Sequence, residues 1–293
     1  MNTPLVFDRA LVRQRLARAL KAGYADFLLA RSVEDLQERL GTVLRSFPLA
    51  LDVGTPTPAA ADALLRSGLT EKVVRLSPTP EPGSVLGDEE RLPFSGGMFD
   101  LAVSLLALQG VNDLPGALIQ IRRALKPDGL FVGALLGGST LNELRQAITQ
   151  AEAELEDGVS PRVAPFADLR DIGGLLQRAG FALPVTDSDI IRVRYANAFA
   201  LMRDLRAMGL TNALNDRRRV PLKRGTLIRA AEIYAERFAD PDGRIPATFE
   251  IVWLSGWTPH ESQQKPLAPG SAKMRLADAL GVKEGGPPPQ PTE

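Results

Sequence analysis

The sequence predicts an α/β fold built on a parallel sheet with helices on both faces. Three short apolar runs, at 49–53, 99–108 and 130–136, have the near-continuous hydrophobicity of strands buried on both faces. Each run is followed by a segment with helical signals, and this alternation is typical of parallel sheets with right-handed crossovers. The first run also ends in Asp52-x-Gly54, the usual opening of a doubly wound, nucleotide-binding domain.

The remaining elements of this α/β part follow in chain order. Thr57 and Pro58 suit the N-cap and the first position of a helix, and Gly68 suits its end. A short β-branched run at 72–76 has the composition of a second strand, and the proline- and glycine-rich stretch after it has that of a loop. The predicted helices span 58–67, 114–125, 140–156 and 167–179.

The later part of the chain differs in kind. The runs at 190–195 and 248–257 have strand composition and are expected to pair as an antiparallel edge, with a helical insertion between them. The Gly/Pro-rich tail from Gly285 has the composition of a disordered segment. The predicted parts are an N-terminal helical segment at 1–46, an α/β domain at 47–195 and 246–265, the insertion at 196–245, and a partly disordered tail at 266–293.

The composition of the 293 residues excludes several classes of function. Lys+Arg and Asp+Glu both number 35, so no overall charge favours nucleic acid or an anionic membrane. Cysteine is absent and there is one histidine, so disulfides, thiolate chemistry and a metal site are not expected. No apolar run approaches the ~20 residues of a membrane span, and a cytoplasmic protein is expected. The basic stretch at 9–21 is interpreted as the first helix, with a transit peptide as the alternative.

Several segments resemble one protein family, over residues 7 to about 280. The general landmarks resemble those of class I S-adenosylmethionine-dependent methyltransferases, which implies a Rossmann-like methyltransferase fold. These landmarks are the strand and turn at 49–54, Gly87-Asp-Glu-Glu-Arg-Leu-Pro-Phe94, Phe99-Asp100, Val111-Asn-Asp-Leu-Pro115 and Leu125-Lys-Pro-Asp-Gly129. Phe7-Asp-Arg9, 137–145 and 260–272 resemble, more specifically, the methyltransferase-fold assembly factors of respiratory complex I, reported to hydroxylate an arginine of a complex I subunit, and their bacterial relatives.

The resemblance implies a set of cofactor-binding residues. In the family, the turn after the first strand approaches the methionine moiety of S-adenosylmethionine. An acid after the second strand binds the ribose, and an acid after the third lies near the adenine. Carried over to this sequence, the cofactor-binding candidates are Asp52, Gly54, Thr55, Asp88, Glu89 and Gln109.

Three segments depart from the family pattern. Pro56 and Pro58 stand where glycines are expected, and proline has no N–H to offer a ligand. Ser77 stands where the ribose-binding acid is expected, and Gln109-Gly110 replaces the usual His-Trp pair. Losing the carboxylate and a turn N–H amounts to about 3–5 kcal/mol, or two to four decades of affinity. Threonine hydroxyls in the turn and the N-terminus of the helix after it favour cofactor binding and so oppose this loss of affinity. The sequence therefore predicts that cofactor binding is weakened or lost.

Catalytic residues are harder to assign. His260 could act as a general base, although a structural histidine at a strand end is the more common case. Asp100 is the other candidate, and a carboxylate at a strand edge more often fixes a loop. The basic run at 216–224 is interpreted either as a solvated face or as a dock for an acidic protein partner.

Two classes of function therefore stay open. One is an enzyme that uses S-adenosylmethionine and acts on a protein side chain. The other is an assembly or binding protein that keeps the fold but has lost the cofactor. In both, the resemblance implies a protein partner, such as a subunit of respiratory complex I. Nucleic acid is not expected as a partner, because no aromatic side chains are interleaved with the basic run.

Overall fold

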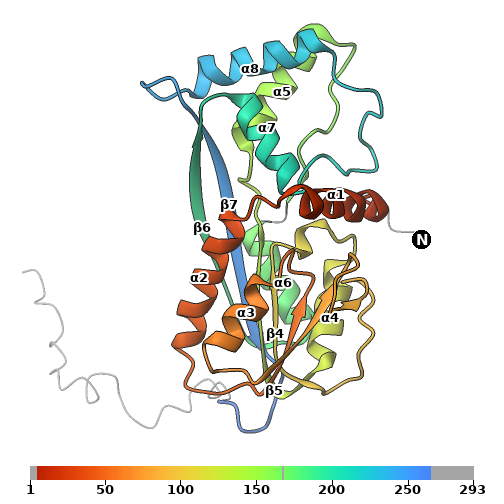
Figure 1. The fold of residues 1–293 in the computed structure, drawn as a ribbon, viewed down its shortest axis with the longest axis vertical. Coiled ribbons are helices and arrows are strands. Elements are labelled where there is room, and N and C mark those ends of the chain that lie inside the picture. The colour runs from red at the N-terminus through yellow and green to blue at the C-terminus, as the bar shows by residue number, and fades with distance from the viewer. Residues whose placement is uncertain (1–4, 167, 265–293) are drawn as a thin grey trace, which may run out of the picture. The chain divides into compact units, whose positions relative to one another are not determined.

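A seven-stranded sheet organises the first of two units, Met1–Pro259 (Figure 1). The structure is a computed structural model in which residues 5–166 and 168–264 are described. The strand order is β3-β2-β1-β4-β5-β7-β6. Strands β1 to β5 run parallel to one another, and β7 is antiparallel to both β5 and β6. The strands are β1 Leu49–Val53, β2 Lys72–Ser77, β3 Val85–Leu86, β4 Phe99–Leu105, β5 Leu125–Leu136, β6 Ala182–Tyr195 and β7 Ile245–Trp257.

The prediction of three adjacent parallel strands is confirmed, with shifted ends. β4 stops at Leu105 because Leu106 adopts a left-handed conformation (φ 52°) and leads into the short 3-10 helix η1, Leu108–Gly110. β5 begins five residues before the predicted Leu130, since the turn around Asp128 (φ 61°) falls within the strand. The end of β4 and the start of β5 therefore differ from the predicted ones because of local backbone geometry, and the predicted topology is unchanged.

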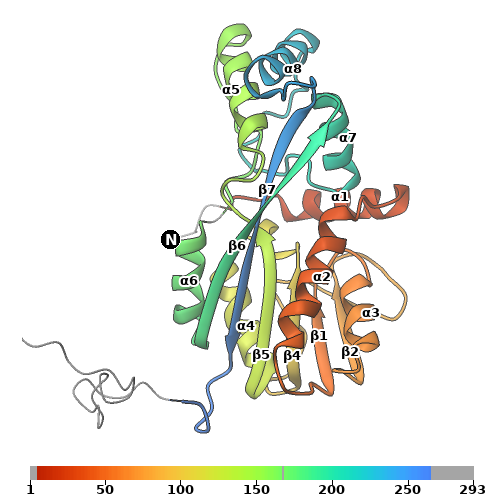
Figure 2. The ribbon, with the colours of Figure 1, turned by 90° about the vertical axis from the view of Figure 1, so that its left-hand side faces the viewer.

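The antiparallel edge is also confirmed and is longer than the sequence predicts. β6 and β7 pair from Ala182 with Trp257 to Tyr195 with Ile245, whereas β5 pairs with β7 only up to Leu136. The rest of β6 and β7 continues as a two-stranded ribbon, and helices α5, α7 and α8 gather around it (Figures 1 and 2).

Eight helices are present among the described residues. Asp8 caps α1 by accepting from the Leu11 amide (3.1 Å), and Asp113 caps α4 by accepting from the Gly116 amide (2.8 Å). α3 starts one residue later than predicted, with Pro58 in the capping position. The helices are α1 Arg9–Ala22, α2 Phe27–Gly41, α3 Ala59–Arg66, α4 Leu114–Ala124, α5 Asn142–Leu155, α6 Leu169–Arg178, α7 Ala198–Ala207 and α8 Arg224–Phe238.

The core has two parts, one on each face of the sheet. Along β5, Leu130 and Val132 face the part that includes α2 and α3, and Phe131 and Leu135 face the part that includes α4 and α6. This alternation follows from the two-residue repeat of a strand. Because β1, β2 and β4 are parallel, their carboxyl ends meet at one edge of the sheet, where a ligand site is expected.

The second unit, His260–Glu293, is described only up to residue 264. The predicted disorder from Gly285 lies outside the described residues, and the predicted division into four parts stays a prediction. Across 5–166 and 168–264, no helix is long and apolar enough to cross a membrane.

Candidate functional site

The turn after β1 brings two of the predicted cofactor residues to the carboxyl edge of the sheet. Gly54 has a positive φ of 73°, and its amide donates to the Leu76 carbonyl (2.9 Å). Thr55 is buried, and its hydroxyl accepts from the Leu105 amide (3.2 Å). Both residues therefore bind the neighbouring strands, and the prolines that follow contribute no N–H to this edge.

Asp52 is buried at this edge of the sheet and is bound to Arg75, a residue that the sequence analysis did not identify. Its Oδ2 accepts from Arg75 Nε on β2 (3.0 Å), and the carboxylate is fully buried. The Arg75 guanidinium also donates to the Thr55 carbonyl (2.9 Å) and to Glu81 (2.5 Å). Burial raises the pKa of Asp52 to about 6, although Arg75 and Thr55 oppose the rise. The signal that could have identified Arg75 is its place as the charged residue between Val74 and Leu76.

Ser77 ends β2 at the place where the family carries its ribose-binding acid. Its hydroxyl donates to the Thr79 carbonyl (2.7 Å) and accepts from the Thr79 amide (3.3 Å), so it closes a local turn. The first carboxylate after it, Glu81, is engaged with Arg75. The described structure thus offers no free carboxylate at the end of β2.

Asp88 and Glu89 follow β3 and are held by α1. Arg9 bonds to both carboxylates, at 3.0 Å from Asp88, and Arg13 also bonds to Asp88. Burial acts to raise the pKa of Asp88, but the Glu90 amide and the two arginines bring it below its usual value. Glu89 is only 4% exposed, and burial raises its pKa against the pull of Arg9. Both acids are therefore satisfied within the protein.

Glu89 also fills the space in front of the glycine turn. A Cβ atom built on Gly54 would lie 2.7 Å from Glu89 Oε1 and 3.1 Å from the Ala107 Cβ. Only glycine fits there, and its bare Cα is covered by the chain's own carboxylate. In the arrangement implied by the family resemblance, this is where the methionine moiety of a cofactor approaches the turn.

The loop after β4 is held by the N-terminal segment. Asn112 accepts from the Phe7 amide (2.7 Å) and donates to the Phe7 carbonyl (3.1 Å), and Arg9 donates to the Gly110 carbonyl (3.0 Å). A Cβ on Gly110 would already contact Val12 of α1, at 3.6 Å. Helix α1 therefore lies where a large ring at this position would need space, beside the strand ends and next to α7 (Figures 1 and 2).

Gln109 lies on η1, close to the same edge. Its Nε2 donates to the Leu106 carbonyl (2.7 Å). Its Oε1 is buried and has no hydrogen-bond partner within the described part of the chain. Asp52 Oδ1 is likewise buried without a hydrogen-bond partner among the described residues, so both Gln109 and Asp52 keep an unused acceptor. The assignment of all six cofactor residues stays a prediction.

The two catalytic candidates form contacts of their own. Asp100 is at the amino end of β4, where it accepts from the Leu49 amide (3.0 Å) and from Lys126 (2.7 Å). Five residues of strand, about 17 Å, separate it from the carboxyl end of β4. His260 belongs to the second unit, where its Nδ1 bonds the Ser262 hydroxyl (2.7 Å). Neither contact involves the cofactor candidates, and the described residues contain no cluster of metal-ligating side chains.

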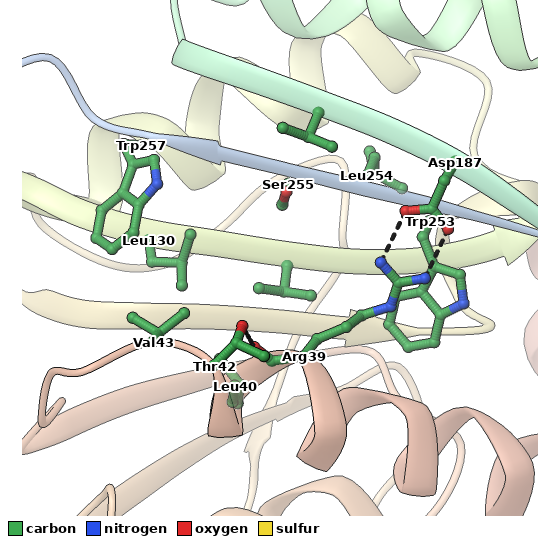
Figure 3. A pocket seen from close by; sticks show the side chains of 12 residues that line it. Arg39, Leu40, Thr42, Val43, Leu130, Asp187, Trp253, Leu254, Ser255 and Trp257 are labelled. Carbon is green, nitrogen blue, oxygen red and sulfur yellow. Dashed lines mark hydrogen bonds and ion pairs between the residues drawn. The ribbon is translucent and has the colours of Figure 1, made fainter. Parts of the chain in front are cut away.

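A concavity of about 220 Å³ lies on the sheet beneath the end of α2 (Figure 3). Its floor is Ser255 of β7, with Val132 and Val185 opposite it on the neighbouring strands. Trp253 and Trp257 flank Ser255 on the same strand and line the concavity. None of the predicted site residues contributes to it. Its volume is below the ~300–1,000 Å³ of most small-molecule sites.

The charged groups around this concavity are paired. Arg39 lies 4.4 Å from the centre of the Trp253 ring and forms two hydrogen bonds with Asp187 (2.6 and 2.7 Å; Figure 3). Arg45 lies over the Trp257 ring and bonds to Asp128 (2.7 Å). The contacts of Arg39 help to hold the end of α2 on the sheet, and neither pair presents an unpaired charge to a ligand.

The fold is the Rossmann-like methyltransferase architecture. A methyltransferase-domain family matches residues 51–133. The structure is similar to a protein from Bacillus halodurans C-125 assigned to the methyltransferases (TM-score 0.53, 15% identity, 78% of this chain and 99% of that one). It is also similar to the YcgJ protein from Bacillus subtilis (TM-score 0.52, 15% identity, the same coverage).

Sequence relatives make the family more specific. The chain is 40% identical to the mitochondrial arginine-hydroxylase NDUFAF5 of Danio rerio over 290 residues, covering 93% of this chain and 89% of the relative. It is 40% identical to the human NDUFAF5 over 296 residues (97% and 86%). It is 36% identical to a malonyl-[acyl-carrier protein] O-methyltransferase of Methylovorus over 297 residues (94% and 98%). The chain belongs to this family of S-adenosylmethionine-dependent methyltransferases, and it is close to the NDUFAF5 arginine hydroxylases.

Proposed function

We propose that this protein acts by binding a partner protein, as an assembly factor does, and that its own binding of S-adenosylmethionine is weakened or lost. The observation that carries the proposal is the pairing of Asp88 and Glu89 with Arg9 and Arg13 of α1. The acids that the family resemblance assigns to the adenine side of the cofactor are already neutralised by the chain itself.

The energetics support this proposal. A cofactor at the turn would have to displace Glu89 from Gly54, and Glu89 is almost fully buried against Arg9. Separating one partner from a buried ion pair costs about 3–5 kcal/mol, which is two to four decades of affinity. The missing acid at Ser77 removes a further ligand contact. Asp88, at 27% exposed, adds little to this cost, because solvent screens its interactions.

The similarity to the arginine-hydroxylase NDUFAF5 proteins supports a protein as the partner. By this analogy, we infer a subunit of a respiratory complex as the partner, in the cytoplasm of a bacterium. The fold alone does not select a partner, so the inference rests on the sequence relatives.

The second candidate function is an enzyme that modifies a protein side chain with bound S-adenosylmethionine. The overall similarity favours it: 93% of the chain aligns with an arginine hydroxylase. Gly54 and Asp88 also match the family pattern given in the sequence analysis. In this case α1 would have to leave the strand ends before the cofactor enters.

Calorimetric titration with S-adenosylmethionine tests the proposal. We expect a dissociation constant in the millimolar range or no measurable heat for the unmodified protein. The double variant Pro56→Gly/Ser77→Asp restores a turn N–H and a carboxylate, so its affinity should be at least tenfold higher. Micromolar binding by the unmodified protein would contradict the proposal and favour the enzyme.

The matched control is Pro82→Gly/Ser84→Asp, which makes the same two kinds of change in the connection between β2 and β3. We expect it to bind S-adenosylmethionine no better than the unmodified protein. An equal gain in both double variants would mean that loop flexibility or added charge, and not the restored contacts, improves binding.

A further inference from the structure

Helix α1 carries basic residues on more than one side. Arg9 and Arg13 bind the acids after β3, as described above. Arg15 and Arg18 follow on the helix at a spacing of three residues, which places them next to each other on its surface. They are not among the residues that form ion pairs within 5–166 and 168–264. One part of the helix thus closes the cofactor edge, and another part presents cations.

The segment after α7 brings a third arginine to this part of α1. The Asp8 amide donates to the Ala213 carbonyl (2.9 Å), and Gly209 lies against α1 so closely that a Cβ there would be 3.1 Å from the Leu16 Cα. Arg217 then reaches back to α1, with its Nη2 3.2 Å from Asp8 Oδ2. The position of Arg217 is therefore fixed by several contacts.

The guanidinium of Arg15 has a nitrogen without a hydrogen-bond partner and no anion paired with it among the described residues. Its Nη1 is fully buried and has no hydrogen-bond partner in the described part of the chain. Burial, followed by the nearby charges of Arg217 and Arg18, lowers the pKa of Arg15. The carboxylate that offsets these charges is Asp8, which already accepts from Arg217 and from the Leu11 amide. A cation that is partly desolvated and faces other cations is stabilised by an added anion.

The basic run at 216–224 is not one surface. Arg218 and Lys223 both turn to Glu156, at 3.3 and 2.9 Å, and that carboxylate is 2% exposed. Hydrogen bonds from Thr226 and Lys223 help to lower the pKa of Glu156 to about 2. The pKa of Asp8, at the start of α1, is lowered by the Leu11 amide and by Arg217, and the charge of Arg219 contributes in the same direction. Two neighbours in sequence, Arg218 and Arg219, therefore belong to different charge clusters.

We propose that Arg15, Arg18, Arg217 and Arg219 form a docking surface for an acidic segment of a partner protein. This inference rests on the proposed function, because it names the chemistry of the partner. The chain has no net charge, so the attraction is local to this surface. No aromatic residue lies within 216–224 to stack with bases, which favours a peptide over single-stranded nucleic acid.

Fluorescence anisotropy with a labelled hexaglutamate peptide and the full chain tests the docking surface. At low salt, the double variant Arg15→Gln/Arg18→Gln should bind the peptide about tenfold more weakly than the unmodified protein, since two cations are removed and one is partly buried. High salt should abolish most of this difference. Equal affinity of the variant and the unmodified protein overturns the inference.

Arg219→Gln and Arg218→Gln provide a matched pair. The first removes a charge from the proposed surface, and the second removes one that is bound to Glu156. We expect peptide binding to weaken in Arg219→Gln and to stay within error in Arg218→Gln. Thermal melts of each variant establish that it is folded. The reverse order, or tighter binding of duplex DNA or anionic vesicles than of the peptide, overturns the assignment of an acidic peptide.

The experiments can contradict the proposed function and the docking surface independently of each other. Arg15→Gln/Arg18→Gln leaves Arg9 and Arg13 in place, so the titration with S-adenosylmethionine should not change. Tight cofactor binding by the unmodified protein contradicts the proposed function whatever the peptide does. Unchanged peptide binding in the double variant contradicts the docking surface alone.

Discussion

Replacing Arg75 by leucine would leave a buried carboxylate without its partner. Asp52 is fully buried and Arg75 is 9% exposed, so solvent cannot replace the lost guanidinium. Removing one member of a buried pair costs about 3–5 kcal/mol. At about 2 °C per kcal/mol for a domain of this size, the melting temperature should fall by about 6–10 °C. The carbonyl of Thr55 also loses a donor, which adds to the loss.

Thermal unfolding followed by circular dichroism at pH 7.5 measures this effect. Lys126→Leu is the control, because it removes a cation from Asp100 in a pair that is 45% and 21% exposed. That change should cost less than about 1 kcal/mol. If Arg75→Leu is no more harmful than Lys126→Leu, the pair with Asp52 does not stabilise the fold and the reasoning about this edge is wrong.

The loss of stability caused by Arg75→Leu, here called the deficit, should be larger at high pH than at low pH. The folded pKa of Asp52 is about 6, above its usual value of 3.8, so the folded state binds the proton more tightly than the unfolded state. Such a group costs stability as the pH rises through this window. Without Arg75 the cost is larger, because the charged form loses its partner. The deficit should therefore be greatest at pH 7 and above, shrink toward pH 5, and be nearly constant in Asp52→Asn/Arg75→Leu.

Two glycine substitutions address the closed edge directly. Gly54→Ala places a Cβ 2.7 Å from Glu89 Oε1 at a residue with positive φ. We therefore expect the free energy of unfolding, measured in urea, to fall by about 2–3 kcal/mol. A fall below about 0.5 kcal/mol, the size expected of an ordinary surface substitution, would mean that Glu89 moves away at little cost. Gly110→Trp places a large ring against Val12, so α1 should protect its amides from hydrogen exchange less well; unchanged protection would contradict the close packing of α1 on this loop.

The fold was predictable because its signals are local and repeated. Each apolar run, such as 99–108, is buried on both faces in the structure, so near-continuous hydrophobicity identified it. The ends of the strands were less predictable. A left-handed Leu106 ends β4, and a non-glycine residue in that conformation gives little sign in the sequence. The first six residues of β7 lie beyond β5, a length that depends on the helices packed around the ribbon and not on the strand itself.

The site was only partly predictable, because its decisive contacts join residues far apart in the chain. Asp88 and Glu89 were identified from their own segment, but their partner Arg9 lies 79 residues away from Asp88. In the sequence, Arg9 stood out only as part of the basic stretch 9–21 and of Phe7-Asp-Arg9, a segment with a family resemblance, and neither pointed to Asp88. Asp52 was assigned to a ligand from its motif, and the structure places Arg75 of the adjacent strand against it.

The same contacts lead to a last prediction, on the response of stability to the cofactor. A ligand that binds only the folded state stabilises it by RT ln(1 + [L]/Kd), so 1 mM S-adenosylmethionine would add about 4 kcal/mol at a micromolar Kd and about 0.4 kcal/mol at a millimolar Kd. These values correspond to shifts in melting temperature of about 8 °C and below 1 °C. Because the carboxylates of this edge are already bound to arginines of the chain, a cofactor would have to compete with these arginines for them. We therefore expect the smaller shift in differential scanning fluorimetry, with adenosine as the control ligand. A rise in melting temperature of several degrees that adenosine does not reproduce would mean that α1 moves away when the cofactor binds. That result would favour the second candidate function, an enzyme that uses S-adenosylmethionine.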